Sequence, residues 1–149
     1  MRIFMSWLII FTFIACKNNK EEKKSDPVRT SAASYLTNDD ILNLSNSADY
    51  VDMLFYHMNI SVSQNDPPSI RQSVNFLTAS GKPSNMQCPP IGRISFLSKG
   101  KIIREADIHL SPGCNYFTII ENKVSSGTVL MSPEGVKFLQ ALIDSYKPQ

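Results

Sequence analysis

The sequence has 149 residues and a formal net charge of +2, and from residue 30 onward it holds nine basic and ten acidic side chains. Roughly 110 residues are left for folding once the N-terminal features below are set aside, which is enough for one domain with its own core. A charge this small argues against nucleic acid as a partner, because nucleic-acid-binding proteins need a basic surface.

The N-terminus has the pattern of an export signal. Residues 3–15 are apolar except for Ser6 and Thr12, and Arg2 supplies a positive charge before them. A membrane-spanning helix needs ~20 apolar residues, so this run is too short to cross a bilayer. The pattern predicts a signal peptide over residues 1–15 that is cleaved after the small residue Ala15.

The next residue extends this pattern. Phe13-Ile14-Ala15-Cys16 resembles the lipobox of bacterial lipoproteins processed by signal peptidase II. The resemblance implies a diacylglyceryl group on the Cys16 thiol and an acylated amine, with palmitate as a typical chain, and two or more chains hold a protein stably at a bilayer. It also implies the bacterial cell envelope, and Lys17 favours the outer membrane, on its periplasmic or its surface side. An ordinary signal peptide and a retained N-terminal anchor are the alternatives.

Residues 16–35 separate the predicted lipid from the rest of the chain. Residues 17–24 are all polar and of mixed charge, and Asp26-Pro27 and a Ser/Ala run follow them. Such a segment has too few apolar side chains to pack. We therefore expect a flexible lipid-anchored tether over residues 16–35 and a single domain over residues 36–149.

Two elements are predicted at the start of this domain. Thr37, ahead of Asp39 and Asp40, predicts a capped helix that stops at the Ser45-Asn46-Ser47 cluster. Residues 50–63 alternate in hydropathy, which favours one strand, with a helix over the first half as the alternative. The apolar face of this strand would consist of Leu54, Tyr56, Met58, Ile60 and Val62.

A helix and a hairpin are predicted next. Asp66 before Pro67-Pro68 predicts a helix start, and Gly81-Lys82-Pro83 predicts its end. Residues 91–110 predict a hairpin around the three-residue loop Ser98-Lys99-Gly100. In this register Arg93 faces Glu105 as an opposite-charge pair. The apolar face would consist of Ile94, Phe96, Ile102, Ala106, Ile108 and Leu110, with Arg104 as the one misfit.

Two further strands and a helix complete the predicted fold. Strands are expected over residues 116–120 and 129–131, and Ser132 before Pro133 predicts the start of the last helix. The buried side of this helix would consist of Val136, Leu139, Leu142, Ile143 and Tyr146. The predicted fold class is α+β, an antiparallel meander sheet of about four to five strands with two to three helices packed on one face.

Cys88 and Cys114 form the strongest candidate pair in the domain. Both lie at the same end of the predicted sheet, and disulfides persist in exported proteins. We therefore predict a structural disulfide between them. The two histidines, His57 and His109, do not complete a ligand set with the spacing of a zinc site, so we expect no metal and no cofactor.

The polar side of the hairpin raises the question of catalysis. Asp107, His109 and Ser111 are the residue types of a catalytic triad. However, side chains two residues apart on a strand lie ~7 Å from each other, which is long for a direct hydrogen bond. We therefore expect a solvated strand face and no enzyme. The expected function is a binding or accessory module for another envelope protein or a polysaccharide, and a small envelope enzyme or an enzyme inhibitor is the alternative.

The candidate partner surface lies at the disulfide end of the sheet. Pro89 and Pro90 follow Cys88, and the turn Ser111-Pro112-Gly113 precedes Cys114, so this end is expected to be rigid. Tyr116 would supply an amphipathic contact, unless it belongs to the core. The polar strand face beside it consists of Arg93, Glu105, Asp107 and His109.

Overall fold

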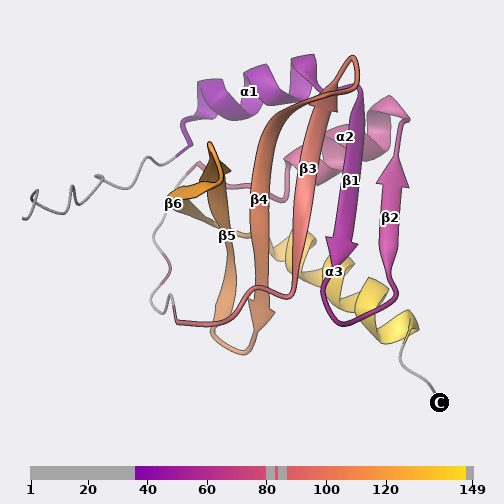
Figure 1. Ribbon diagram of the computed structural model, residues 1–149, viewed down its shortest axis with the longest axis vertical. Helices are drawn as coiled ribbons and strands as arrows, with labels where there is room; N and C mark the ends of the chain where they lie inside the picture. Colours follow the sequence, from indigo (N-terminus) through magenta and orange to yellow (C-terminus); the bar gives the residue numbers. More distant parts are fainter. Residues whose placement is uncertain (1–35, 80–82, 84–86, 147–149) are drawn as a thin grey trace, which may run out of the picture.

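A computed structural model of the protein describes residues 36–79, 83 and 87–146 (Figure 1). The predicted signal peptide, the lipidated Cys16 and the tether lie outside the described residues, as do Gly81 and Lys82 of the predicted helix end.

The domain is a six-stranded antiparallel sheet with its helices packed on one face (Figure 1). The strands lie in the order β2-β1-β3-β4-β5-β6, so the last four form a meander and the β1–β2 hairpin extends it. The α+β fold class is confirmed, with more strands than predicted. The elements are α1 (Asn38–Ser47), β1 (Tyr50–Phe55), β2 (Ser61–Gln64), α2 (Pro67–Val74), β3 (Gly92–Ser98), β4 (Lys101–Ser111), β5 (Cys114–Glu121), β6 (Val124–Leu130) and α3 (Pro133–Ser145).

All three helices begin where the sequence predicts. The side chains of Thr37, Asp66 and Ser132 each accept a hydrogen bond from a backbone N–H three residues ahead. Asp40 also accepts from the Thr37 backbone N–H at 2.8 Å, which completes a capping box. These starts could be predicted because every partner lies within one turn of the chain.

One predicted helix end was right and one was wrong. α1 ends at Ser47, the last residue of the predicted Ser45-Asn46-Ser47 cluster, and the N–H of Ala48 donates the final helical hydrogen bond to the Leu44 carbonyl. α2 ends at Val74, well before Gly81, because the chain leaves the helix to join the sheet. Leu77 forms an isolated antiparallel bridge with Met131, a partner more than fifty residues away.

The single strand predicted over residues 50–63 is a hairpin. The chain turns after β1, with His57 in the left-handed region at φ 59°, and returns as β2. The predicted apolar face was also wrong for β1, where Val51, Met53 and Phe55 are buried and Leu54 is 53% exposed. Only the neighbouring β3 and the helices decide which side of this strand is covered.

The β3–β4 hairpin exists, but its predicted register was wrong. Its loop contains two residues, and a bulge at Ile103 shifts the pairing by one further residue. Arg93 therefore faces Asp107 rather than Glu105. The bulge also turns Ile102 to solvent, whereas Ile94, Ala106 and Ile108 remain on the buried face as predicted.

The core lies between the sheet and the helices. It includes Phe96 and Phe117 of the sheet and Leu139 of α3, all essentially inaccessible to solvent. Tyr146 at the end of α3 is exposed, contrary to prediction, because it lies beyond the last residue of the helix. β6 also begins five residues earlier than predicted, at Val124.

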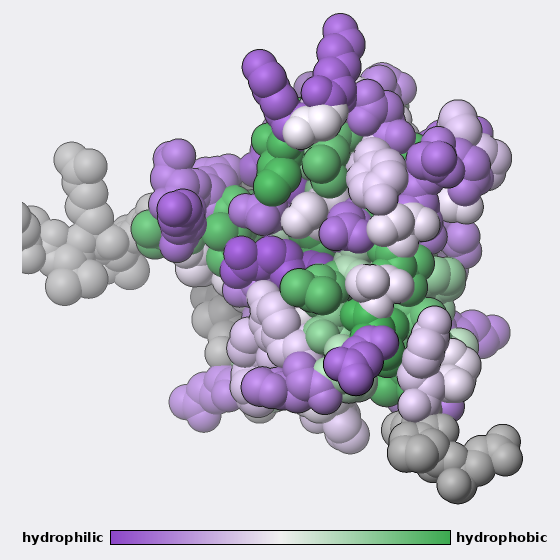
Figure 2. Space-filling view, turned by 45° about the vertical axis from the view of Figure 1, so that its right-hand side comes forward, coloured by the Kyte–Doolittle hydropathy of each residue, from purple (hydrophilic) through white to green (hydrophobic). Residues whose placement is uncertain are grey.

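Not all apolar side chains enter this core. Hydrophobic side chains also reach the surface, among them a group at the end of the molecule where α1 lies (Figure 2). Within residues 36–79, 83 and 87–146, no helix is long and apolar enough to cross a bilayer.

Candidate functional site

The sheet face opposite the helices, here called the open face, carries most of the candidate residues. Because side chains alternate along a strand, one residue in two of β1, β3, β4 and β5 points to this side. Its members include Asp52, Leu54, Arg93, Ser95, Glu105, Asp107, His109, Tyr116 and Thr118. In Figure 1 this face is turned to the viewer and the helices lie behind the sheet.

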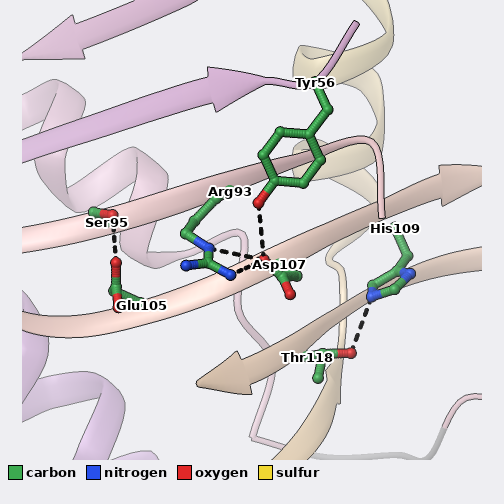
Figure 3. A network of polar contacts seen from close by, with 7 residues as sticks. All are labelled: Tyr56, Arg93, Ser95, Glu105, Asp107, His109 and Thr118. Atoms are coloured by element: carbon green, nitrogen blue, oxygen red, sulfur yellow. Dashed lines mark hydrogen bonds and ion pairs between the residues drawn. The ribbon is translucent and has the colours of Figure 1, made fainter. Parts of the chain in front are cut away.

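A charged cluster stands at the middle of the open face (Figure 3). Asp107 Oδ1 accepts hydrogen bonds from Arg93 Nε and Nη2, both at 2.8 Å, and from the Tyr56 hydroxyl at 3.3 Å. The bond to Asp107 raises the pKa of Arg93. Burial, and then the charge of Asp107, raise the pKa of Tyr56. Arg93 is therefore cationic and Tyr56 neutral, and Asp107 holds both in place.

Glu105, the predicted partner of Arg93, lies two residues before Asp107 on β4 and faces Ser95. Its carboxylate accepts a hydrogen bond from Ser95 at 3.4 Å instead. Asp52 on β1 accepts one from Ser63 on β2 at 2.8 Å. Two half-buried carboxylates thus flank the cluster.

These side chains surround a shallow depression of about 350 Å³. It is lined by Asp52, Leu54, Tyr56, Arg93, Ser95 and Glu105. Leu54 supplies an exposed apolar contact among polar groups. The depression combines hydrogen-bond acceptors, a fixed guanidinium and part of an aromatic ring, which can recognise a polar ligand.

His109 and Tyr116 lie on the same face but are covered. Their rings stack with centroids 4.2 Å apart and an interplanar angle of 12°. His109 Nδ1 donates to the Cys88 carbonyl at 2.7 Å, and the Thr118 hydroxyl donates to Nε2 of the neutral ring at 3.0 Å (Figure 3). Burial lowers the pKa of His109 and raises that of Tyr116.

The cover over these rings is the segment that contains the disulfide. Cys88 is bonded to Cys114, as predicted, with a Cα–Cα distance of 6.3 Å. The chain then rejoins the sheet at Ile91, whose N–H donates to the carbonyl of Ile108 at 2.8 Å. The bridge thereby holds residues 87–91 across the end of the open face.

This cover overturns one expectation about the partner surface. Tyr116 is only 1% exposed, so its ring cannot reach a partner, and His109 is buried with it. The alternative prediction was right that Tyr116 is buried, but it is buried on the open face under the bridged segment rather than between the sheet and the helices. Of the predicted partner surface, Arg93, Glu105 and Asp107 remain accessible in part.

The arrangement also decides the triad question. Asp107 bonds to Arg93 and Tyr56 rather than orienting His109, and both nitrogens of His109 have structural partners. His57 lies on the turn after β1, far along the chain from the other candidates. In the part of the chain that the structure describes, no group of three His, Cys, Asp or Glu side chains could hold a metal ion.

Sequence reasoning missed four residues of the depression, namely Asp52, Leu54, Tyr56 and Ser95. The first three follow each other at every second position, two in β1 and Tyr56 directly after it, and so line the same depression. The alternation of these residues along the strand was visible in the sequence, but Leu54 and Tyr56 were assigned to the buried face. The charge of Asp52 within this period was the signal that could have placed this side toward solvent.

No family model, curated protein or solved structure matches this chain.

Proposed function

We propose that this protein is a lipid-anchored bacterial envelope protein whose domain is a binding module, with the open face as the surface that takes its partner. The partner is another envelope protein or a polysaccharide. The lipobox-like residues ending at Cys16 support the anchor. The depression on an uncovered sheet face carries the binding proposal.

The charged cluster favours binding because its side chains are already ordered. Binding costs free energy when mobile side chains must be immobilised, about 0.5–1.5 kcal/mol each. Arg93 and Tyr56 have incurred this cost in the free protein, since both are held by Asp107. The remaining N–H groups of Arg93 and the ring of Tyr56 can then contact a ligand with little further loss of entropy.

Two leucines with similar exposure allow a matched test. Leu54 lines the depression and is 53% exposed, whereas Leu42 on α1 is 59% exposed and lies outside it. Leu54→Lys should disturb the open face, and Leu42→Lys should add the same charge elsewhere. Neither change removes a buried contact, so both variants should fold.

The assay is co-purification of the full chain from detergent-solubilised membranes, followed by protein identification and sugar analysis. The wild type and Leu42→Lys should recover the same protein or polysaccharide, and Leu54→Lys should recover at least tenfold less. Equal recovery by the two variants would exclude the open face as the binding surface.

A further inference from the structure

The end of the sheet opposite the disulfide exposes apolar side chains on two hairpin tips. Ile102 follows the β3–β4 turn and is 56% exposed, and Val124 follows the β5–β6 turn and is 66% exposed. Ile103, the bulged residue of β4, is also exposed. Burying such side chains is favourable, so a cluster of them marks a contact surface.

Both tips have a defined shape. Lys99 and Gly100 have φ values of 51° and 74°, and Asn122 and Lys123 have 52° and 65°. Positive φ at both central residues is the signature of a tight two-residue hairpin turn. The apolar side chains therefore project from short, rigid ends of the sheet rather than from long loops.

Basic side chains surround the apolar ones. Lys99, Lys101 and Lys123 are all exposed at these two tips. The nearby acids have partners, since Asp49 accepts from the Lys99 backbone N–H at 2.7 Å and Glu121 pairs with Arg104 at 2.6 Å. Between the tips lies a groove of about 520 Å³ whose lining includes Ile102 and Ile103.

α1 packs beside the tips and brings two acids to this end. Asp40 lies near Arg104 and is engaged in the capping box with Thr37, and Asp39 is exposed in the first turn of the helix. The three lysines extend from the hairpin turns, whereas these acids belong to the helix layer. The projecting part of this end therefore carries apolar groups and positive charge.

We propose that the two hairpin tips seat the domain on an anionic bilayer, with Ile102, Ile103 and Val124 entering the interface and the three lysines contacting lipid phosphates. Apolar side chains flanked by lysines suit a membrane surface, because the long lysine chains reach headgroups while the apolar groups enter the acyl boundary. Tyr50, partly exposed and paired with Leu97 next to the β3–β4 turn, fits the aromatic level of such an interface.

The described chain begins at the same end of the domain as the two tips (Figure 1). Its first residue is Leu36, just before α1, and α1 lies beside the tips (Figure 1). A tether over residues 16–35 would have a root-mean-square length of ~25 Å as a flexible coil. The tips would thus be held close to the lipid at high effective concentration, so a weak interaction would suffice. This inference rests on the anchor of the proposed function but not on the open face.

The test uses tryptophan fluorescence of the full chain in vesicles. Trp7 is the one tryptophan of the sequence and lies in the predicted signal peptide, so Trp7→Phe gives a silent background. Ile102→Trp then reports from the tip, and Leu54→Trp, at a leucine of nearly equal exposure on the open face, is the matched control. The vesicles contain phosphatidylglycerol with brominated acyl chains, which quench a tryptophan that enters the bilayer.

We expect emission from Ile102→Trp to shift to shorter wavelength and to be quenched at least twofold more than emission from Leu54→Trp. Val124→Trp, on the second tip, should behave like Ile102→Trp. It provides a second reporter if one of the two variants does not fold. Adding Lys99→Glu, Lys101→Glu and Lys123→Glu should reduce the quenching to the level of the control, whereas Lys137→Glu on α3 should leave it unchanged.

Flotation of the same vesicles separates this inference from the anchor. Protein that floats with the vesicles while both tip variants are quenched no more than Leu54→Trp keeps the anchor and overturns the inference. Membrane proteins can also be added to the vesicles. If the emission of Ile102→Trp then shifts to shorter wavelength without bromine quenching, the tip contacts a protein, and this result would also overturn the inference. Quenching at both tips with loss under the lysine reversals supports it.

Discussion

Reducing the Cys88–Cys114 bridge should destabilise the domain by an amount that follows from its position in the chain. The two cysteines are 26 residues apart, and the chain-entropy relation for a loop of this length gives about 3.5 kcal/mol of stabilisation. For a domain of about 110 residues this corresponds to a fall in Tm of roughly 14–20 °C. The free energy of unfolding should be measured by urea titration and circular dichroism, with and without reductant.

A matched variant separates the bridge from general effects of the reductant. Cys88→Ala with Cys114→Ala should be as unstable as the reduced wild type, with a small extra loss because Cys114 is buried, and should not respond to reductant. A difference below about 1 kcal/mol between oxidised and reduced wild type would refute the loop-entropy argument.

The same experiment has a local readout at His109. Burial under the bridged segment is the largest cause of its lowered pKa, and the carbonyl of Cys88 is the acceptor of its Nδ1–H. Releasing the segment exposes the ring, so the pKa of His109 should rise toward its ordinary value in the reduced protein. Titration of the imidazole by NMR measures this, and an unchanged pKa would mean that residues 87–91 stay in place without the bridge.

Three further changes test other parts of the molecule. Gly135→Ala should destabilise α3 by ~1–3 kcal/mol in urea unfolding, although alanine favours helices, because its Cβ would lie 2.9 Å from Cβ of Phe76; equal or higher stability would contradict this. The unfolded chain binds the His109 proton at about pH 6.5 and the folded chain only at lower pH. The stability from this group is therefore complete above pH ~6.5 and is lost as the pH falls through the folded pKa; His109→Gln should flatten this dependence, and an unchanged dependence in that variant would contradict the argument. Cys16→Ser should yield unprocessed precursor without lipid by mass spectrometry, and mature membrane-held protein in that variant would contradict the lipoprotein prediction.

Local contacts explain which features could be predicted from the sequence. The N-caps Thr37, Asp66 and Ser132 were found because a cap binds a backbone N–H only three residues away. The disulfide could be predicted because the turn at residues 111–113 and the end of the hairpin place both cysteines at one end of the sheet. The α+β fold class followed from the order of such local elements.

Strand register and strand faces could not be obtained in this way. The two-residue loop and the one-residue bulge at Ile103 together changed the partner of Arg93 from Glu105 to Asp107, and so created the cluster with Tyr56. The energy of a bulge depends on both strands and on the helix packed beside them, so it leaves no clear mark in one strand's sequence. The depression therefore exists only because of pairings between distant segments.

The sequence by itself determined where the helices start, which cysteines pair and which residues alternate along each strand. Only the tertiary structure decided which of the two alternating sets is covered. Leu54 is exposed because the helices of the described residues pack on the other side of β1, and Tyr116 is buried because the bridged segment crosses its side of β5. Burial depends on what lies above a side chain, and the chain brings that cover from far away in the sequence.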